Sequence, residues 1–213
     1  MALLAAAPSP LFAQDPGSPP RLMRGDVSGT VGWVSTNKED LTYDSYNDWR
    51  SQAAFSIGAG WYWTDHHQTR VEVSGTTEET VYSAFPAPFP VQTFYPVRRT
   101  FDSRKVSITQ HYQFRRNEWI HPFLGAGVDL VRERVTRKDD AVFTYDPITR
   151  QSRLVRDVVQ HGPENEDSAR GVLTAGVKAY LSRKVFALTD LRVSIGGRRT
   201  EDVQWRFGLG ADF

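Results

Sequence analysis

Charged residues that alternate with apolar ones are the residues of this chain best placed to carry chemistry. In one short segment, Arg70 and Glu72 alternate with Val71 and Val73. The same spacing occurs in other segments, at positions Lys105, Asp129, Lys178, Asp190, Arg192 and Arg206. Charges of both signs on one face can pair and close a protein interior, or exchange partners and open a narrow path for ions. The spacing alone leaves both interpretations open.

The histidines do not form a recognisable catalytic or metal-binding motif. His111 has Thr109 and Gln113 two positions away, whereas acyl hydrolysis needs a nucleophile, a base and an acid that converge. His66 and His67 are adjacent in a short turn, where such a pair is more often solvated than bound to a metal. The chain contains no cysteine and so no thiolate nucleophile or ligand. We therefore expect no catalytic, metal-binding or cofactor-binding residues.

The elements that position these residues are predicted to be β-strands, because apolar residues also recur with a period of two. Residues 202–213 show this most clearly, with apolar side chains at Val203, Trp205, Phe207, Leu209, Ala211 and Phe213. Similar alternation covers residues 26–34, 49–64, 68–76, 104–114, 122–130, 169–181 and 185–195. The total is about eight strands, each near or above the ~9–11 residues that cross a bilayer when tilted.

The connections between these strands alternate in length. Three are short, at residues 65–67, 115–118 and 182–184, and the long ones are residues 37–48, 79–100 and 137–167. Short turns at one end and long loops at the other are typical of outer-membrane barrels, which have turns in the periplasm and loops outside the cell. An even number of strands places both ends of the chain on the periplasmic side.

The distribution of side-chain size decides which face points outward. The apolar face carries the bulky residues, including several tryptophans, and the polar face is rich in Gly, Ser and Thr. Eight strands enclose an interior only just wide enough for side chains, so the bulky residues fit better outside, against lipid. Residues 26–213 are therefore predicted to form an all-β, eight-stranded antiparallel up-and-down transmembrane β-barrel. A soluble, lipocalin-like barrel is the alternative, with the opposite orientation. Two aromatic belts are expected, at Trp61, Trp63, Tyr112, Phe114, Trp119 and Phe213 and at Trp33 and Trp49.

Length, charge and the first residues set further limits. A net charge of +1 over 213 residues gives no reason to expect nucleic acid as a partner. No run approaches the ~20 apolar residues of a transmembrane helix. Residues 1–14 are interpreted as a signal-peptide remnant that ends near Ala13, with a disordered Ala/Pro-rich tail as the alternative. Residues 15–25 are expected to form a periplasmic N-terminal lead-in.

Three segments resemble the small eight-stranded outer-membrane β-barrels of Gram-negative bacteria, of the outer-membrane-protein A and W type. They are FSIGAGWYWTDHHQTRVEVSG at 55–75, IHPFLGAGVDL at 120–130 and WRFGLGADF at 205–213. The resemblance implies export through the periplasm, residence in the outer membrane among lipids and lipopolysaccharide, and folding by the barrel-assembly machinery. That machinery reads a C-terminal signal, which here corresponds to Trp205, Phe207, Leu209 and Phe213.

The resemblance is specific for the fold and not for one activity, because this architecture hosts several functions. A structural or surface-interaction role without catalysis, with a closed polar lumen and long extracellular loops, is the first interpretation. A narrow channel for ions or small solutes is the alternative, and a lipid A-modifying enzyme is the second alternative.

Turn positions also predict which charges pair inside the barrel. With residues 115–118 as the centre of one hairpin, Lys105 is expected to face Asp129. Around residues 182–184, Lys178 is expected to face Asp190, with Arg192 and Arg206 close to the same carboxylate.

Outside the barrel, three arginines and two loops are candidate contact sites. Arg104, Arg132 and Arg134 lie on outward faces of neighbouring predicted strands, where guanidinium groups could bind lipopolysaccharide phosphates or remain solvated. Loops 79–100 and 137–167 are candidate sites for an extracellular partner. Residues 84–96 could equally form a lid, residues 141–159 are predicted to form a β-hairpin that turns at 146–149, and residues 161–168 a polar, mobile link.

Overall fold

The computed structural model describes residues 24–37, 49–86, 94–114, 119–146, 148–196 and 199–213. No helix in these residues is long and apolar enough to cross a membrane. Within the described segments, the regular elements are the β-strands β1 (Gly25–Asn37), β2 (Trp49–Tyr62), β3 (His67–Thr76), β4 (Glu79–Pro86), β5 (Phe94–Gln113), β6 (Ile120–Asp139), β7 (Val142–Asp146), β8 (Gln151–Arg156), β9 (Val159–Tyr180), β10 (Val185–Gly196) and β11 (Arg199–Asp212).

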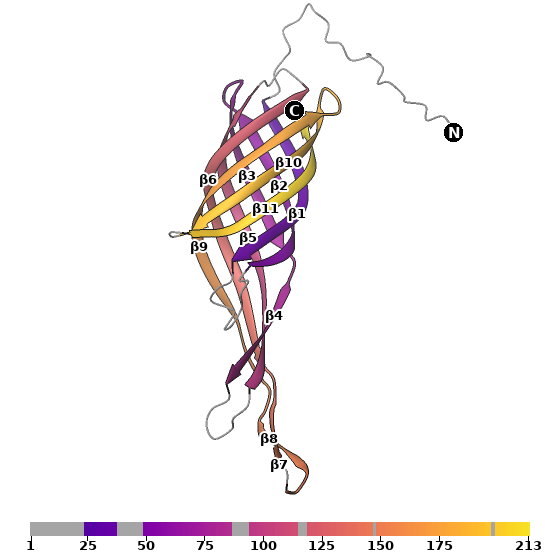
Figure 1. Ribbon diagram of the computed structural model, residues 1–213. Helices are drawn as coiled ribbons and strands as arrows, with labels where there is room; N and C mark the ends of the chain where they lie inside the picture. The colour runs from indigo at the N-terminus through magenta and orange to yellow at the C-terminus, as the bar shows by residue number, and fades with distance from the viewer. Residues whose placement is uncertain (1–23, 38–48, 87–93, 115–118, 147, 197–198) are drawn as a thin grey trace, which may run out of the picture.

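Antiparallel pairing closes these strands into a barrel (Figure 1). Neighbouring strands follow the order β3-β2-β1-β11-β10-β9-β6-β5-β4, and β3 also pairs with β5. Strands β3 and β4 both lie along β5, so they are two parts of one barrel strand. The result is the predicted eight-stranded up-and-down barrel, with β7 and β8 as a separate hairpin.

Three strands are much longer than the rest and leave the barrel together. β5 and β6 have 20 residues each and β9 has 22, whereas β1 has 13 and β10 has 12. The parts of β5, β6 and β9 that continue past one end of the barrel form a ribbon with β4 and the β7–β8 hairpin (Figure 1). We call the described parts of residues 79–103 and 131–168 the extension. The C-terminus lies at the opposite end of the barrel.

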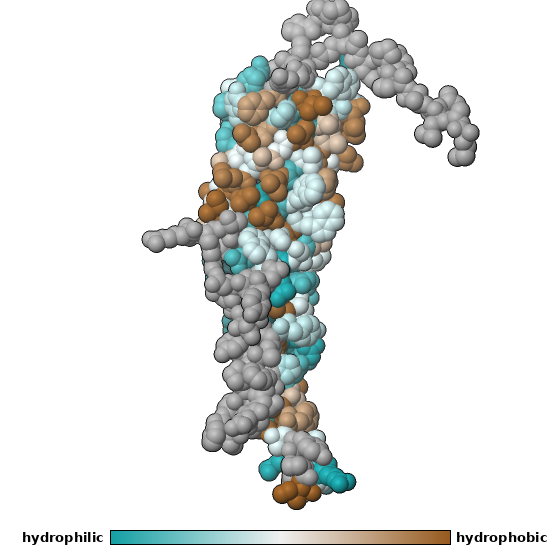
Figure 2. Space-filling model, in the orientation of Figure 1, coloured by the Kyte–Doolittle hydropathy of each residue, from teal (hydrophilic) through white to brown (hydrophobic). Residues whose placement is uncertain are grey.

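The barrel is apolar outside and polar inside, as the sequence predicts. Ile57 and Leu209 are 74% and 60% exposed, whereas Lys178 and Arg206 are 1% and 3% exposed. Figure 2 shows apolar side chains gathered over the outside of the barrel. A soluble barrel would bury its apolar face, so the lipocalin-like alternative is wrong. The apolar outer part of β1 runs from Gly25 to Trp33, a length of about 27 Å along the strand. With strands tilted by roughly 40°, this length corresponds to a height of about 20 Å along the barrel axis, close to the ~25 Å apolar band of outer-membrane barrels.

Small residues make room for the polar side chains inside. A Cβ atom on Gly60 would lie 2.0 Å from Gln68 Nε2, and one on Gly125 would lie 2.4 Å from His111 Cδ2. Glycine at these positions lets larger polar groups on the neighbouring strands fill the bore. This explains why the sequence alternates bulky apolar residues with glycine along β2 and β6.

The loop predictions are partly corrected by the extension. The predicted hairpin within residues 141–159 is confirmed by the pairing of β7 with β8. The prediction of a mobile link at 161–168 is wrong, because these residues belong to β9 and pair with β6. In the region 84–96, residues 84–86 pair with 94–96 in the extension (Figure 1) and do not fold back over the bore, whereas 87–93 lie outside the described residues. The predicted signal remnant at 1–14, most of the lead-in at 15–25 and the turn at 115–118 also lie outside them.

Candidate functional site

The bore holds a buried polar network whose first part centres on Asp26 of β1, near the end of the barrel with the short turns. Its carboxylate accepts hydrogen bonds from Gln68 Nε2 at 2.5 Å and Arg70 Nη1 at 3.1 Å. The Tyr62 hydroxyl donates to Asp26 Oδ2 at 3.0 Å, and Lys178 Nζ reaches the same oxygen from across the bore. All five side chains are buried. Through these contacts Asp26 joins β1 to β2, β3 and β9.

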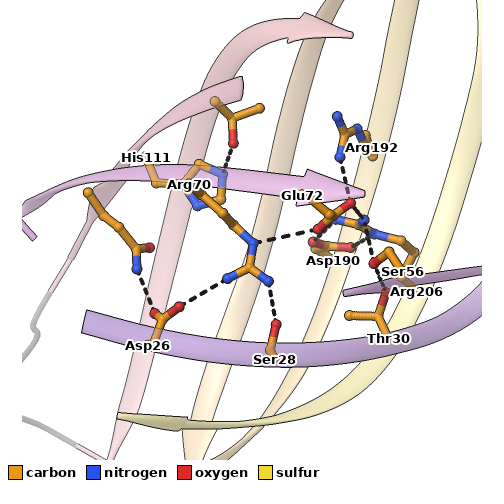
Figure 3. A network of polar contacts seen from close by, with 12 residues as sticks. Asp26, Ser28, Thr30, Ser56, Arg70, Glu72, His111, Asp190, Arg192 and Arg206 are labelled. Carbon is orange, nitrogen blue, oxygen red and sulfur yellow. Dashed lines mark hydrogen bonds and ion pairs between the residues drawn. The ribbon is translucent and has the colours of Figure 1, made fainter. Parts of the chain in front are cut away.

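Glu72 of β3 organises the middle of the bore (Figure 3). Its Oε1 atom accepts a hydrogen bond from Arg192 Nη1 at 3.0 Å and another from Arg206, and its Oε2 atom lies 3.5 Å from Arg70 Nε. Arg206 also binds Asp190 on the neighbouring strand through two hydrogen bonds of 2.8 and 2.6 Å. One carboxylate therefore joins three guanidinium groups from three strands.

The end of the bore beneath the extension has its own ion pairs. Lys105 Nζ donates to Asp202 Oδ2 at 2.7 Å, and both side chains are buried. Arg170 Nη2 donates to Glu133 Oε1 at 2.8 Å, and its Nη1 lies 3.5 Å from Asp202 Oδ2. These contacts join β5, β6, β9 and β11 where the barrel gives way to the extension.

The predicted pair of Lys105 and Asp129 is wrong. Both side chains are buried, but the ladder places Ser107 opposite Asp129 and Val131 opposite Lys105. Asp129 instead accepts hydrogen bonds from Arg192 and, at 3.1 Å, from Ser194 Oγ. Gln113 pairs with Phe123, so Lys105 and Asp129 are two positions out of the predicted register.

The predicted pair of Lys178 and Asp190 is also wrong. Asp190 lies opposite Gly176 and Lys178 lies opposite Leu188, two positions from the expected register. Asp190 binds Arg206, which lies directly opposite it on β11, as the sequence analysis expected of a close neighbour. Arg192 contacts Glu72 and Asp129 rather than Asp190.

Sequence reasoning missed several members of the network. Asp26, Tyr62, Gln68 and Asp202 are all buried and all contribute to the ion pairs or hydrogen bonds described above. The sequence could have identified them, because each lies on the polar face of a predicted strand in the period-of-two pattern. The apolar group of Phe123, Phe186 and Leu188 inside the barrel was also missed. The ring of Phe186 lies 4.8 Å from Lys178 Nζ.

The arrangement of the bore is suited to holding the barrel closed. Each of five buried basic residues contacts at least one of five buried carboxylates, Asp26, Glu72, Asp129, Asp190 and Asp202. His111 is packed into the same wall, with Nε2 3.0 Å from Thr109 Oγ1 and its ring stacked 4.9 Å from that of Phe123. Among the described residues, no group of three or more His, Cys, Asp or Glu side chains could hold a metal ion.

The three candidate arginines on the outside lie at the junction of barrel and extension. Arg104, Arg132 and Arg134 are exposed, and Arg104 lies directly opposite Arg132 across β5 and β6. Arg132 donates two hydrogen bonds, of 2.7 and 2.9 Å, to Asp167 of β9. This hydrogen bonding lowers the pKa of the Asp167 carboxyl below its ordinary value. Arg134 lies opposite Asp102.

Comparisons with known proteins agree with this geometry. No protein-family model and no curated protein sequence matches the chain. Neisserial surface protein A matches with a TM-score of 0.56 at 15% identity, over 89% of this chain and 97% of its own. The N-terminal β-barrel domain of Pseudomonas aeruginosa OprF matches with a TM-score of 0.50 at 12% identity, over 90% and 98%. The fold is that of the small eight-stranded outer-membrane β-barrels.

A third structure with this outer-membrane barrel fold is Ail, the attachment invasion locus protein of Yersinia pestis. It was solved in complex with the heparin analogue sucrose octasulfate and matches with a TM-score of 0.50 at 12% identity, over 90% of this chain and all of its own. As in such barrels, exposed aromatic residues occur at both ends, with Trp61 and Phe213 at one end and Trp33 and Trp49 at the other. Gly25 and Phe213 exchange backbone hydrogen bonds of 3.1 and 2.9 Å where β1 meets the C-terminal end.

Proposed function

We propose that the chain is a bacterial outer-membrane protein in which the barrel is a closed anchor and the extension contacts partners outside the cell. The observation that carries this proposal is the contrast between a bore filled by buried ion pairs and an extension that reaches well beyond the barrel and carries exposed charged residues. Export through the periplasm and a surface-interaction role at residues 79–100 and 137–167 form part of the proposal.

Cell fractionation and bilayer recordings test this proposal. A folded outer-membrane barrel is recovered with the outer membrane and changes its migration on SDS gels when boiled. We expect that behaviour, together with an absence of conductance steps in planar bilayers. Recovery in a soluble fraction would contradict the membrane location, and steady conductance steps would contradict the closed bore.

A narrow channel for ions or small solutes is the second candidate function. It is favoured by Glu72, which is shared by the guanidinium groups of Arg70, Arg192 and Arg206. A carboxylate with several available cations can exchange partners without leaving a charge unpaired. Rare openings that disappear in a Glu72→Gln variant would support this candidate.

We infer that Arg104, Arg132 and Arg134 contact lipopolysaccharide phosphates. Arg104 and Arg132 lie opposite each other on β5 and β6, just beyond the apolar residues Val106 and Leu130, and guanidinium groups are well suited to phosphates. Cells in which all three are changed to alanine should become more sensitive to chelation of divalent cations. Unchanged sensitivity would remove this proposal.

We also propose that Trp205, Phe207, Leu209 and Phe213 form the signal read by the barrel-assembly machinery. All four side chains are exposed on the outside of the barrel, where a partner can reach them. Removal of Phe213 should reduce assembly in the outer membrane far more than removal of the exposed Ile148. We further propose a role without catalysis, which unchanged lipid A mass profiles with and without the protein would support.

A further inference from the structure

A cluster of basic residues surrounds one carboxylate in the extension, well beyond the barrel. We call it the Asp139 cluster, and it consists of Arg99 of β5, Arg137 and Asp139 of β6, Arg156 of β8 and His161 of β9. Arg99 lies five residues beyond Arg104 on β5, or about 17 Å along the strand. The cluster is therefore separate from the three arginines at the junction of barrel and extension.

Asp139 holds the surrounding cations in place. It is fully buried, and its two oxygens accept hydrogen bonds from Arg137 Nε at 2.6 Å, Arg137 Nη2 at 3.1 Å and Arg156 Nη2 at 2.8 Å. His161 Nε2 lies 3.9 Å from the same carboxylate. The side chains of Arg137 and Arg156 are still 36% and 34% exposed. Each guanidinium group is thus oriented by Asp139, and each of the two side chains remains partly exposed.

Positive charge at this level of the extension exceeds negative charge. The ladder places Arg99 directly opposite Arg137 and Arg98 directly opposite Lys138, and like charges in such positions destabilise a sheet. Burial and the nearby Arg137 lower the pKa of Arg99. Among the described side chains near this level, the carboxylates are Asp139, Asp140, which is bound to Arg98 at 2.9 Å, and Asp157, which follows Arg156. Glu79 and Glu164 lie two positions closer to the barrel, beside Phe101 and Val135.

We propose that the Asp139 cluster binds a phosphate or sulfate ester carried by a sugar. Such a group brings negative charge to opposed arginines, and planar guanidinium groups recognise its oxygens through paired hydrogen bonds. Ladders fix β5, β6 and β9 relative to one another, and a hydrogen bond to Asp139 holds Arg156 of β8, so the cations are preorganised. The inference rests on the proposed surface-interaction role and names the chemistry of the partner. Two sources carry this chemistry, the phosphorylated core sugars of lipopolysaccharide and sulfated glycans from elsewhere.

The test is a binding titration with the full-length protein refolded in lipid nanodiscs at low salt. The probes are a phosphorylated lipopolysaccharide core oligosaccharide and a fully sulfated disaccharide. The double variant Arg99→Gln with Arg156→Gln should bind at least tenfold more weakly than wild type. The control, Arg150→Gln with Arg153→Gln, removes the same charge from exposed residues near or on β8 and should bind within twofold of wild type.

Other outcomes separate this inference from the proposed function. If the test and control variants bind the probes equally weakly, the attraction is non-specific and the Asp139 cluster is not a binding site. Loss of binding only when Arg104, Arg132 and Arg134 are changed would also overturn it, but would leave the lipopolysaccharide proposal standing. Absence of binding by wild type overturns the site, whereas recovery in the outer membrane tests the proposed function separately. The probe that binds more tightly shows whether the natural partner is the lipopolysaccharide core or a sulfated glycan. Arg99→Lys with Arg156→Lys, which keeps the charge, checks folding and should restore binding in part.

Discussion

Charged residues are arranged differently in the bore and in the extension. In the bore, buried basic residues contact buried carboxylates across the barrel, as Lys178 does with Asp26 and Lys105 with Asp202. In the extension, Arg99 faces Arg137 and Arg98 faces Lys138 across neighbouring strands. Burying an unpaired charge costs several kcal/mol, so the bore requires a match. In the proposed topology the extension lies in water, which tolerates an excess of one sign.

This difference indicates which part of the chain is structural and which is available for partners. In the bore, each of the buried residues Arg70, Lys105, Lys178, Arg192 and Arg206 forms an ion pair with a buried carboxylate. In the extension, Arg137 and Arg156 keep part of their surface exposed although hydrogen bonds to Asp139 hold them in position. The same substitution should therefore change the free energy of unfolding much more in the barrel than in the extension.

The largest effect is expected for Glu72→Ala, which leaves three buried guanidinium groups without their shared carboxylate. Loss of one partner from a buried ion pair typically costs about 3–5 kcal/mol. Urea unfolding of the protein refolded into liposomes measures this loss. Glu164→Ala, the same change at an exposed position of β9, is the control and should leave the unfolding midpoint unchanged. Equal midpoints for the two variants would show that the bore network does not hold the barrel.

A slightly smaller effect is expected for Ile57→Arg in the apolar outer surface. Arginine facing the middle of a bilayer costs about 2–4 kcal/mol in outer-membrane barrels. Val155→Arg on β8 adds the same charge at an exposed apolar residue of the extension. The same urea experiment should show destabilisation only for Ile57→Arg. Similar values for both would mean that Ile57 does not face lipid.

The smallest effect is expected for the exposed pair of Arg132 and Asp167. The pKa of Asp167 is lowered from 3.8 because Arg132 donates hydrogen bonds to the carboxylate. The pair therefore stabilises the charged form above pH 3.8, and its contribution is lost only as the pH falls through the lowered pKa. An NMR titration of Asp167 should have its midpoint below 3.8, and Arg132→Ala should raise it with no measurable change in urea unfolding. A midpoint at or above 3.8 in the wild type would contradict the contact.

The fold could be predicted from the sequence because strand faces follow from a period of two, but the ion pairs could not. A slip of one residue exchanges the two faces, whereas a slip of two preserves them. The expected pairs of Lys105 with Asp129 and Lys178 with Asp190 were misplaced in this second way, so the residues were assigned to the correct side but to the wrong partners.

Other contacts depend on closure of the barrel or on tertiary pairing. Lys178 and Asp26 are 152 residues apart and meet across the bore, so no hairpin rule could pair them. The polar composition of residues 161–168 suggested a loop, but pairing with β6 supplies the backbone hydrogen bonds that make it a strand. The Asp139 cluster likewise forms only where β5, β6, β8 and β9 come together, and no local pattern indicated it.

Spin labels test the contrast between barrel and extension most directly, because the chain has no native cysteine and single cysteines can be labelled without interference. Labels at Ile57 and Leu209 on the barrel and at Leu154 on β8 report whether each apolar residue meets lipid or water. In liposomes, the two barrel labels should be accessible to oxygen and protected from a water-soluble nickel chelate, and the label at Leu154 should show the reverse. Ready access of the nickel chelate to Ile57 and Leu209 would contradict the membrane-facing orientation.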